Sequence, residues 1–354
     1  MTGTLLQMFP LEKRSFWQQA AAEERRIQEI RLRAGKPILI MMEGREWYLD
    51  QEGRFTDKQA QGSLVTAKEL QMLLQHICHD SLYAFEDELR QGFITVNGGH
   101  RVGIAGQVVL SGDGSVKTIK HVSYMNIRVS HEIKGAADEL LPLVYEKGRL
   151  KNVLIISPPG CGKTTLLRDL IRQISDGNAC AGGMCVGVVD ERSEIAGSYL
   201  GSPQNDVGCR TDVLDACPKA LGMMLLLRSM SPRVIAVDEL GGREDMEALH
   251  LAASCGSRIL ATVHGEDLWD IQKKQGLQRI FEDRLFDCFP VLGKEKGRCV
   301  IKRVYGREEA YASDFGGGYD YFRQPGLGTL VPPAVYQPSA DTAGIGRNSG
   351  AFYE

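Results

Sequence analysis

The segment 155–167, IISPPGCGKTTLL, places glycines, a lysine and two threonines between an apolar run and a stretch that can form a helix. Gly160 and Gly162 let successive backbone N–H groups turn toward phosphate oxygens, and a helix N-terminus adds partial positive charge. Lys163 would then reach the β- and γ-phosphates, the Thr164 hydroxyl would coordinate Mg²⁺, and Thr165 would cap the helix or line the nucleotide. The segment therefore predicts a phosphate-binding loop that takes a nucleotide with Mg²⁺.

The predicted loop begins where the apolar run ends. Ser157 stands where this motif usually has a glycine, but a small side chain at the end of a strand should fit there. The alternative is a glycine turn without a ligand. The complete set of predicted nucleotide-binding residues is Ser157, Pro158, Pro159, Gly160, Cys161, Gly162, Lys163, Thr164 and Thr165.

Two later apolar runs also end in polar side chains. RVIAVDELGG ends in Asp238 and Glu239, which would place one carboxylate near the Mg²⁺ shell and the other near the water that attacks the γ-phosphate. We therefore expect Asp238 to be a metal ligand, or alternatively a helix cap, and Glu239 to be the general base or the residue that positions the water. ATVHG places Thr262 and His264 at the end of another strand, where His264 would donate to the γ-phosphate or have a structural role.

A third run, VVDERSEI, ends in an acidic group made of Asp190, Glu191 and Glu194. Carboxylates so close together favour a cation or a basic partner, so we predict catalytic roles for them with Mg²⁺ or a neighbouring arginine. An exposed charged loop is the alternative. Arg192 and Arg210 flank this group and are candidate sensors of the nucleotide.

The elements that would carry these residues form an α/β domain over 151–312. Short apolar strands alternate with helices expected at 165–175, 218–229, 243–254 and 266–285, as in a mostly parallel sheet. FDCFPVL and RCVIKRVY would add a closing hairpin. Before this domain we expect a linker helix over 131–150, and after it a flexible tail over 313–354 that is rich in Gly, Pro and Tyr.

The N-terminal part, residues 1–130, is predicted to form a smaller α+β domain. Residues 15–33 are expected to be mostly helical, and Thr66 with Glu69 forms a capping box for a second helix. The sequence then becomes β-rich, with NGG at 97–99 as a hairpin signal.

Composition places the chain among ordinary water-soluble proteins. The 354 residues carry a net charge of -3 with 25% charged residues, which does not give the basic excess of a nucleic-acid binder. Nine cysteines without a C-x-x-C pair are expected to be reduced thiols in a cytosolic protein, with Cys161 exposed in the loop. No apolar run reaches the ~18 residues of a membrane span, so we expect recruitment to a membrane rather than insertion.

The order of these motifs resembles that of the type II/type IV secretion and pilus-motor ATPases. LRSMSPRVIAVDELGGRED is similar to the family's strand entry and terminal glutamate, with Arg228, Pro232 and Glu239 at the matching positions. It departs from the family by having Arg233 where Asp is usual and Asp238 where Gly is usual. The resemblance implies a RecA-like P-loop NTPase fold, ATP and Mg²⁺ as ligands, and a ring, expected to be a hexamer.

Longer segments, including GFITVNGGHRVGIAGQVV and DVGCRTDVLDACPKALGM, resemble a sporulation-specific branch of endospore-forming bacteria. This resemblance implies a cytoplasmic ATPase of the mother cell that powers a secretion-like channel made of membrane proteins. It also implies an arginine supplied by a neighbouring N-terminal domain, for which Arg101 and Arg128 are the candidates; either is alternatively a surface charge. A nucleic-acid-dependent P-loop ATPase is the other functional reading, although no basic stripe with aromatic residues supports it. A nucleotide-gated scaffold is disfavoured by Glu239.

Overall fold

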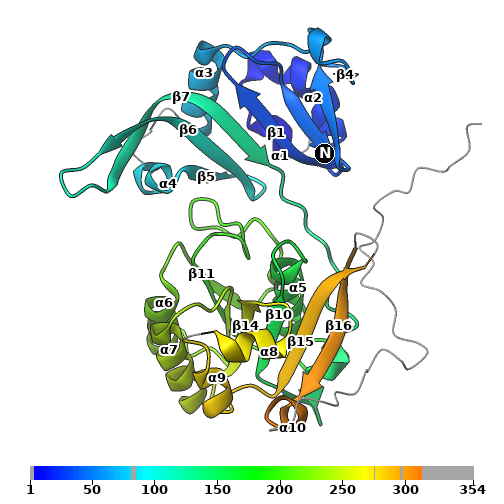
Figure 1. Cartoon of the computed structure of the whole chain (residues 1–354), viewed down its shortest axis with the longest axis vertical. Coiled ribbons are helices and arrows are strands. Elements are labelled where there is room, and N and C mark those ends of the chain that lie inside the picture. The colour runs from blue at the N-terminus through cyan, green and yellow to red at the C-terminus, as the bar shows by residue number, and fades with distance from the viewer. Residues whose placement is uncertain (1–3, 80, 82–84, 275, 296–297, 313–354) are drawn as a thin grey trace, which may run out of the picture.

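In the computed structural model, two seven-stranded sheets form separate parts of the molecule. The structure describes residues 4–79, 81, 85–274, 276–295 and 298–312. Figure 1 shows the N-terminal sheet in blue to cyan above the second sheet, whose elements run from green to orange. The α/β class predicted from the sequence is confirmed.

The N-terminal sheet is antiparallel, with the strand order β4-β3-β2-β1-β7-β6-β5. Its β5–β6 turn contains Gly98 and Gly99 with φ of 86° and 71°, the left-handed conformation that a tight hairpin needs. This confirms the hairpin signal at 97–99. The elements of this part are α1 (Thr4–Gln7), α2 (Arg14–Ala22), β1 (Ile27–Arg33), β2 (Leu39–Met42), β3 (Arg45–Leu49), β4 (Phe55–Thr56), α3 (Ala67–Ile77), α4 (Glu86–Gln91), β5 (Phe93–Val96), β6 (His100–Leu110) and β7 (Val116–Arg128).

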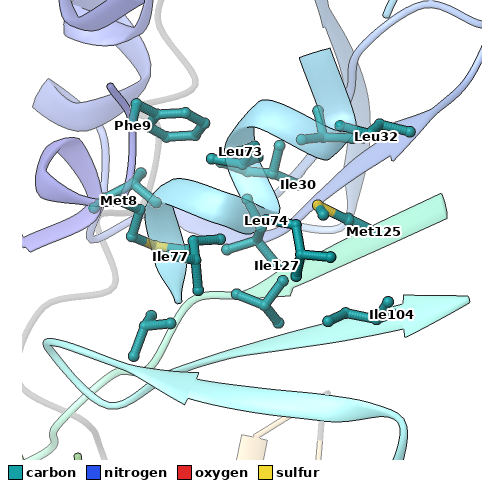
Figure 2. Close-up of a cluster of buried hydrophobic side chains, with 14 of the residues drawn as sticks. Met8, Phe9, Ile30, Leu32, Leu73, Leu74, Ile77, Ile104, Met125 and Ile127 are labelled. Atoms are coloured by element: carbon teal, nitrogen blue, oxygen red, sulfur yellow. The ribbon is translucent and has the colours of Figure 1, made fainter. Parts of the chain in front are cut away.

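Helix α3 covers one face of this sheet and closes the first core. Its start is fixed by the predicted capping box, in which the Thr66 hydroxyl accepts from the Glu69 N–H at 3.1 Å and the Glu69 carboxylate accepts from the Thr66 N–H. Leucine and isoleucine at positions 70, 73, 74 and 77 lie on one helical face and are buried. Figure 2 shows Leu73, Leu74 and Ile77 lying over sheet side chains such as Ile127.

The second sheet has the order β12-β11-β13-β14-β10-β15-β16 and is parallel except for the last pair. Strands β10, β11 and β13 are buried on both faces, and alternate residues of β10 pack into two different cores. The elements are β10 (Val153–Ser157), α5 (Lys163–Asp176), β11 (Val186–Asp190), β12 (Thr211–Asp215), α6 (Lys219–Ser229), β13 (Val234–Val237), α7 (Arg243–Ser254), β14 (Arg258–His264), α8 (Leu268–Lys273), α9 (Arg279–Glu282), β15 (Cys288–Glu295), β16 (Arg298–Gly306) and α10 (Arg307–Ala310).

Three helix predictions need correction. The helix expected over 15–33 ends at Ala22, and 27–33 form β1; a bulge between Ile27 and Glu29 interrupts the strand alternation that would have revealed it. The linker helix over 131–150 is wrong: turns and a 3-10 segment (Leu141–Leu143) lead into β8 (Tyr145–Glu146) and β9 (Arg149–Leu150), because Gly135 and Gly148 take positive φ and Pro142 lacks an N–H.

The helix expected over 266–285 is divided into α8 and α9. Lys274 is extended and Gly276 has a φ of 89°, and neither conformation continues a helix. The tail predicted over 313–354 lies outside the described residues. Among the helices of the described chain, none has both the length and the apolar character needed to cross a bilayer.

Candidate active site

The carboxyl ends of three neighbouring parallel strands bring the predicted residues together. Strand β14 lies between β10 and β13, and Ser157 at the end of β10 is in register with His264 at the end of β14. Asp238 and Glu239 directly follow the last residue of β13. Strand ends at a point where the chain order changes direction are the usual ligand sites of open α/β sheets.

The glycine-rich loop between β10 and α5 has the backbone that phosphate binding requires. Gly160 and Gly162 have φ of 68° and 77°, which strongly disfavours other residues. At Gly162, a Cβ would also come within 3.3 Å of the Cys299 sulfur. The first N–H groups of the 14-residue helix α5 lack partners within the helix, so they are available as donors beside the loop.

Lys163, Glu239 and His264 are in mutual contact at this edge. The buried Lys163 Nζ donates to Glu239 Oε1 at 2.7 Å and lies 3.0 Å from His264 Nε2. His264 Nε2 lies 2.8 Å from the same carboxylate oxygen. Residues far apart in the sequence thus converge on one point beside the loop.

The carboxylate of Glu239 is held in its charged form. Burial alone would raise the pKa of Glu239, but the hydrogen bond from Lys163 and the charges of Lys163, Arg192 and His264 lower it below its usual value. The Glu239 backbone has a φ of 56°, and its N–H donates to Thr262 Oγ1 at 2.9 Å. A left-handed conformation at a non-glycine residue is a strained feature that often marks a functional site.

Thr164 and Asp238 form a second pair next to this group. The Thr164 hydroxyl donates to Asp238 Oδ2 at 2.6 Å, and Thr262 Oγ1 contacts the other oxygen of Asp238. Thr262 therefore links Asp238 and Glu239. Asp238 does not cap a helix, because the following helix α7 begins at Arg243 after Gly242.

The acidic group of residues 190–194 separates into three environments. Asp190 is buried and accepts backbone N–H groups of Glu194 and Ala196 at 2.9 and 2.8 Å. Burial raises the pKa of Asp190, and these N–H groups only partly offset it. Glu191 pairs with Lys219, and Glu194 accepts from Arg101 at 2.8 Å. None of the three has a described contact with Lys163 or Glu239.

The candidate arginines also differ in position. Arg101 lies over the Phe93 ring, 3.5 Å from its centroid, and pairs with Glu194. Arg128 lies 3.7 Å from Glu29, and Arg210 donates to the carbonyl of Ser175 at 3.0 Å. Arg192 Nη1, by contrast, is 2.6 Å from Glu239 Oε2.

The remaining loop residues have local roles. Ser157 is buried and its hydroxyl donates to the Pro158 carbonyl at 2.9 Å, whereas Pro159 is exposed. Thr165 is half-buried in the first turn of α5. Cys161 was predicted to be exposed, which is wrong: its side chain packs into the core beneath the loop and only 4% of its surface is accessible.

These residues fit a nucleotide with Mg²⁺. A glycine cradle and a buried lysine suit phosphate groups, while a threonine hydroxyl beside a carboxylate supplies two oxygen ligands for Mg²⁺. Within the described chain, no cluster of three His, Cys, Asp or Glu side chains would hold a metal ion by itself.

Comparison by sequence identifies the family of this chain. The family model "Sporulation stage III, protein AA" matches residues 3–311. The stage III sporulation protein AA of Bacillus subtilis (strain 168) is 41% identical over 282 residues, which are 80% of this chain and 87% of that protein.

Solved structures of a pilus motor and of an ATPase have a similar fold. The pilus retraction motor PilT with bound ADP gives a TM-score of 0.58 at 17% identity, covering 84% of this chain and 85% of the other. The ATPase DotB of Yersinia pseudotuberculosis gives 0.55 at 15% identity, covering 86% and 83%. At these identities the likeness concerns the fold alone.

Proposed function

Because this chain belongs to the Sporulation stage III, protein AA family, we propose that it is a Mg²⁺-dependent ATPase with a RecA-like P-loop domain. The observation that carries the proposal is the convergence of Lys163, Glu239 and His264 beside the glycine loop. These are the side chains that phosphoryl transfer to water needs: a cation for phosphate, a carboxylate for water and a donor for the transferred group.

Each residue has a specific proposed role. The N–H groups of the loop from Gly160 to Thr165 and the Lys163 ammonium bind the phosphates. Thr164 and Asp238 hold Mg²⁺, which when bound neutralises phosphate charge. Glu239, held as a carboxylate, orients or deprotonates the attacking water.

His264 and the acidic group have supporting roles in this proposal. His264 donates to the γ-phosphate from the end of β14. Asp190 fixes the loop after β11 through its backbone contacts, while Glu191 and Glu194 place this loop through Lys219 and Arg101. Arg101 and Arg128 are the candidates for the arginine that reaches a neighbouring subunit's γ-phosphate; Arg128 is 64% exposed, whereas Arg101 would first have to leave Glu194.

At the level of the assembly, we propose a motor that powers a sporulation-specific transport channel between mother cell and forespore. The family supports the sporulation role, and the pilus retraction motor among the similar structures supports the mechanical one. The partners would be further copies of this chain in a hexameric ring and membrane proteins of the channel, with the ATPase on the cytoplasmic side of the mother cell. The near-neutral charge balance gives no reason to include nucleic acid.

The decisive experiment is steady-state ATP hydrolysis by the full chain and by Lys163→Ala over a range of protein concentrations, with and without single-stranded nucleic acid. Lys13→Ala is the matched control, because Lys13 forms a 2.8 Å ion pair with Glu69 on the N-terminal part. Hydrolysis that needs Lys163, increases in specific activity with concentration and ignores nucleic acid supports the proposal. Hydrolysis that survives in Lys163→Ala refutes this site, and severalfold stimulation by nucleic acid favours a nucleic-acid-dependent ATPase.

A further inference from the structure

The loop of residues 191–196, which follows β11, reaches both the candidate base and the N-terminal sheet. From this loop Arg192 contacts Glu239 at 2.6 Å, and two residues later Glu194 contacts Arg101 at 2.8 Å. We propose that Arg192 is the positioning residue for Glu239 and that the Arg101–Glu194 pair ties its loop to the N-terminal sheet. The proposal rests on the proposed ATPase function, because it concerns the carboxylate assigned to the attacking water.

The two carboxylate oxygens of Glu239 contact different side chains. Oε1 is shared by Lys163 and His264, whereas Oε2 contacts Arg192. Lys163 and His264 both have proposed tasks at the phosphates, whereas the ion pair of Arg192, which the sequence suggested as a nucleotide sensor, is with the Glu239 carboxylate. Arg192 is therefore the partner that can hold Glu239 without serving a second group, and its charge-assisted contact with Oε2 opposes rotation of the carboxylate.

The backbone beneath Arg192 is fixed from several sides. The buried Asp190 carboxylate accepts the N–H groups of Glu194 and Ala196, and the buried Arg168 donates to the carbonyl of Glu194 at 2.6 Å and to that of Ile195. Ser193 has a φ of 53° and donates through its hydroxyl to Asp215 at 2.7 Å. A loop held in this way can place a long side chain reproducibly, as a positioning role requires.

The same loop borders the space between the two parts of the molecule. Arg101, Arg192 and Glu194 line one cleft together with Phe93 and Arg128. Arg101 is held in that cleft both by Glu194 and by the face of the Phe93 ring on β5. A change in the position of the N-terminal sheet would therefore reach Glu239 through a chain of only two ion pairs.

If Arg192 had only a structural role, its truncation would change the stability of the fold and leave turnover unchanged. The Arg192 side chain is 62% exposed and that of its partner Glu239 is 18% exposed, so their ion pair should contribute a small but measurable amount to stability. Arg307 provides a matched control, since it also forms a 2.6 Å ion pair, with Asp287, and is 53% exposed. Truncation of either arginine should affect the fold similarly, but only truncation of Arg192 should affect turnover.

The test compares Arg192→Ala, Arg192→Lys and Arg307→Ala in the full chain by steady-state ATP hydrolysis and by binding of a fluorescent ATP analogue. We expect Arg192→Ala to lower kcat by about 10- to 100-fold, with the Kd of the analogue within about twofold of wild type. Arg192→Lys should recover part of kcat, and Arg192→Ala should add no loss to Glu239→Gln. Glu194→Gln, which weakens the tie to Arg101, should lower kcat less than Arg192→Ala does.

A second measurement does not depend on turnover. Melting temperatures of Arg192→Ala, Glu239→Gln and the double variant, taken without nucleotide, should be non-additive if the two side chains interact. If the wild type did not hydrolyse ATP, the proposed function would be contradicted, but the melting temperatures of the two single variants and the double variant would still test the Arg192–Glu239 contact. Additive melting temperatures, an unchanged kcat in Arg192→Ala, or a raised Kd with unchanged kcat would each overturn the inference.

Discussion

At the scale of single residues, Glu239 is the group on which the proposed chemistry depends most. Its two oxygens contact three positively charged or donating side chains, and its N–H is fixed by Thr262. Such contacts keep a carboxylate ionised and oriented, but only its charge and basicity can activate water. Binding and turnover should therefore respond differently when the carboxylate is replaced by an amide of the same shape.

We predict that Glu239→Gln keeps nucleotide binding and loses turnover by about 100-fold or more. The glutamine amide retains the size of the side chain, and Lys163 and the glycine loop remain in place to bind phosphate. Equilibrium binding of a fluorescent ATP analogue and single-turnover hydrolysis measure the two properties separately. Normal turnover in this variant would remove Glu239 from its proposed role.

The thiols provide a residue-scale test of the buried cores. Burial raises the pKa of Cys288 to about 12 and that of Cys78 to about 11, which leaves very little thiolate at pH 8. Cys185, Cys209 and Cys255 are exposed. We predict that iodoacetamide labels these three first, and that Cys78 and Cys288 react only on unfolding; peptide mass spectrometry over time measures the order. Early labelling of Cys288 would contradict its placement in the core.

At the scale of elements, the position of α6 depends on a glycine. A Cβ at Gly222 would lie 2.5 Å from Val189 Cγ1 on β11, so the helix can approach the sheet only without a side chain there. Alanine would improve helix propensity by about 1 kcal/mol, whereas overpacking costs about 1–3 kcal/mol. The clash is with a β-branched side chain of a buried strand, so the cost of overpacking should exceed the gain.

We therefore predict that Gly222→Ala lowers the free energy of unfolding by up to about 2 kcal/mol, measured by urea denaturation. Ser254→Ala on the exposed side of α7 is the control and should change stability by less than about 0.5 kcal/mol. A stabilised Gly222→Ala would show that α6 can move away from β11 at little cost.

Sequence patterns predicted the elements that position the site better than those that connect it. The strands ending at Ser157, Val237 and His264 are mostly apolar, so their ends and the polar residues there were visible. Strand β12 (Thr211–Asp215) was missed because it is a half-buried edge strand with acidic residues. The Arg192–Glu239 contact was also missed, since it joins two loops 47 positions apart, the difference of their numbers, and no periodicity encodes such a pairing.

At the scale of the whole molecule, the two sheets have separate cores. The first core extends from Leu5 to Val129 and the other two from Ala137 to Ala310, with no shared buried residue. The described contacts between the parts are mostly polar, including Arg101–Glu194 and the Gly98 N–H to Gln204. Tyr199 adds a partly buried apolar contact with the first core. We therefore propose a domain boundary near residue 130.

This division leads to a calorimetric prediction that connects the fold with the proposed ligand. Two parts joined by only a few polar contacts should unfold in two transitions, because such contacts couple the parts weakly. The glycine loop, Lys163 and Glu239 all belong to the second part, so Mg²⁺–ADP should raise only the transition of that part. At 100 times its Kd, the ligand would add about 2.7 kcal/mol, or roughly 5–10 °C for a domain of this size. Lys163→Ala should abolish the shift and leave the first transition unchanged.

A single transition that moves as a whole with Mg²⁺–ADP would instead mean that the polar contacts couple both sheets into one cooperative unit. In that case N-terminal residues such as Arg101 would sense the nucleotide within the same chain.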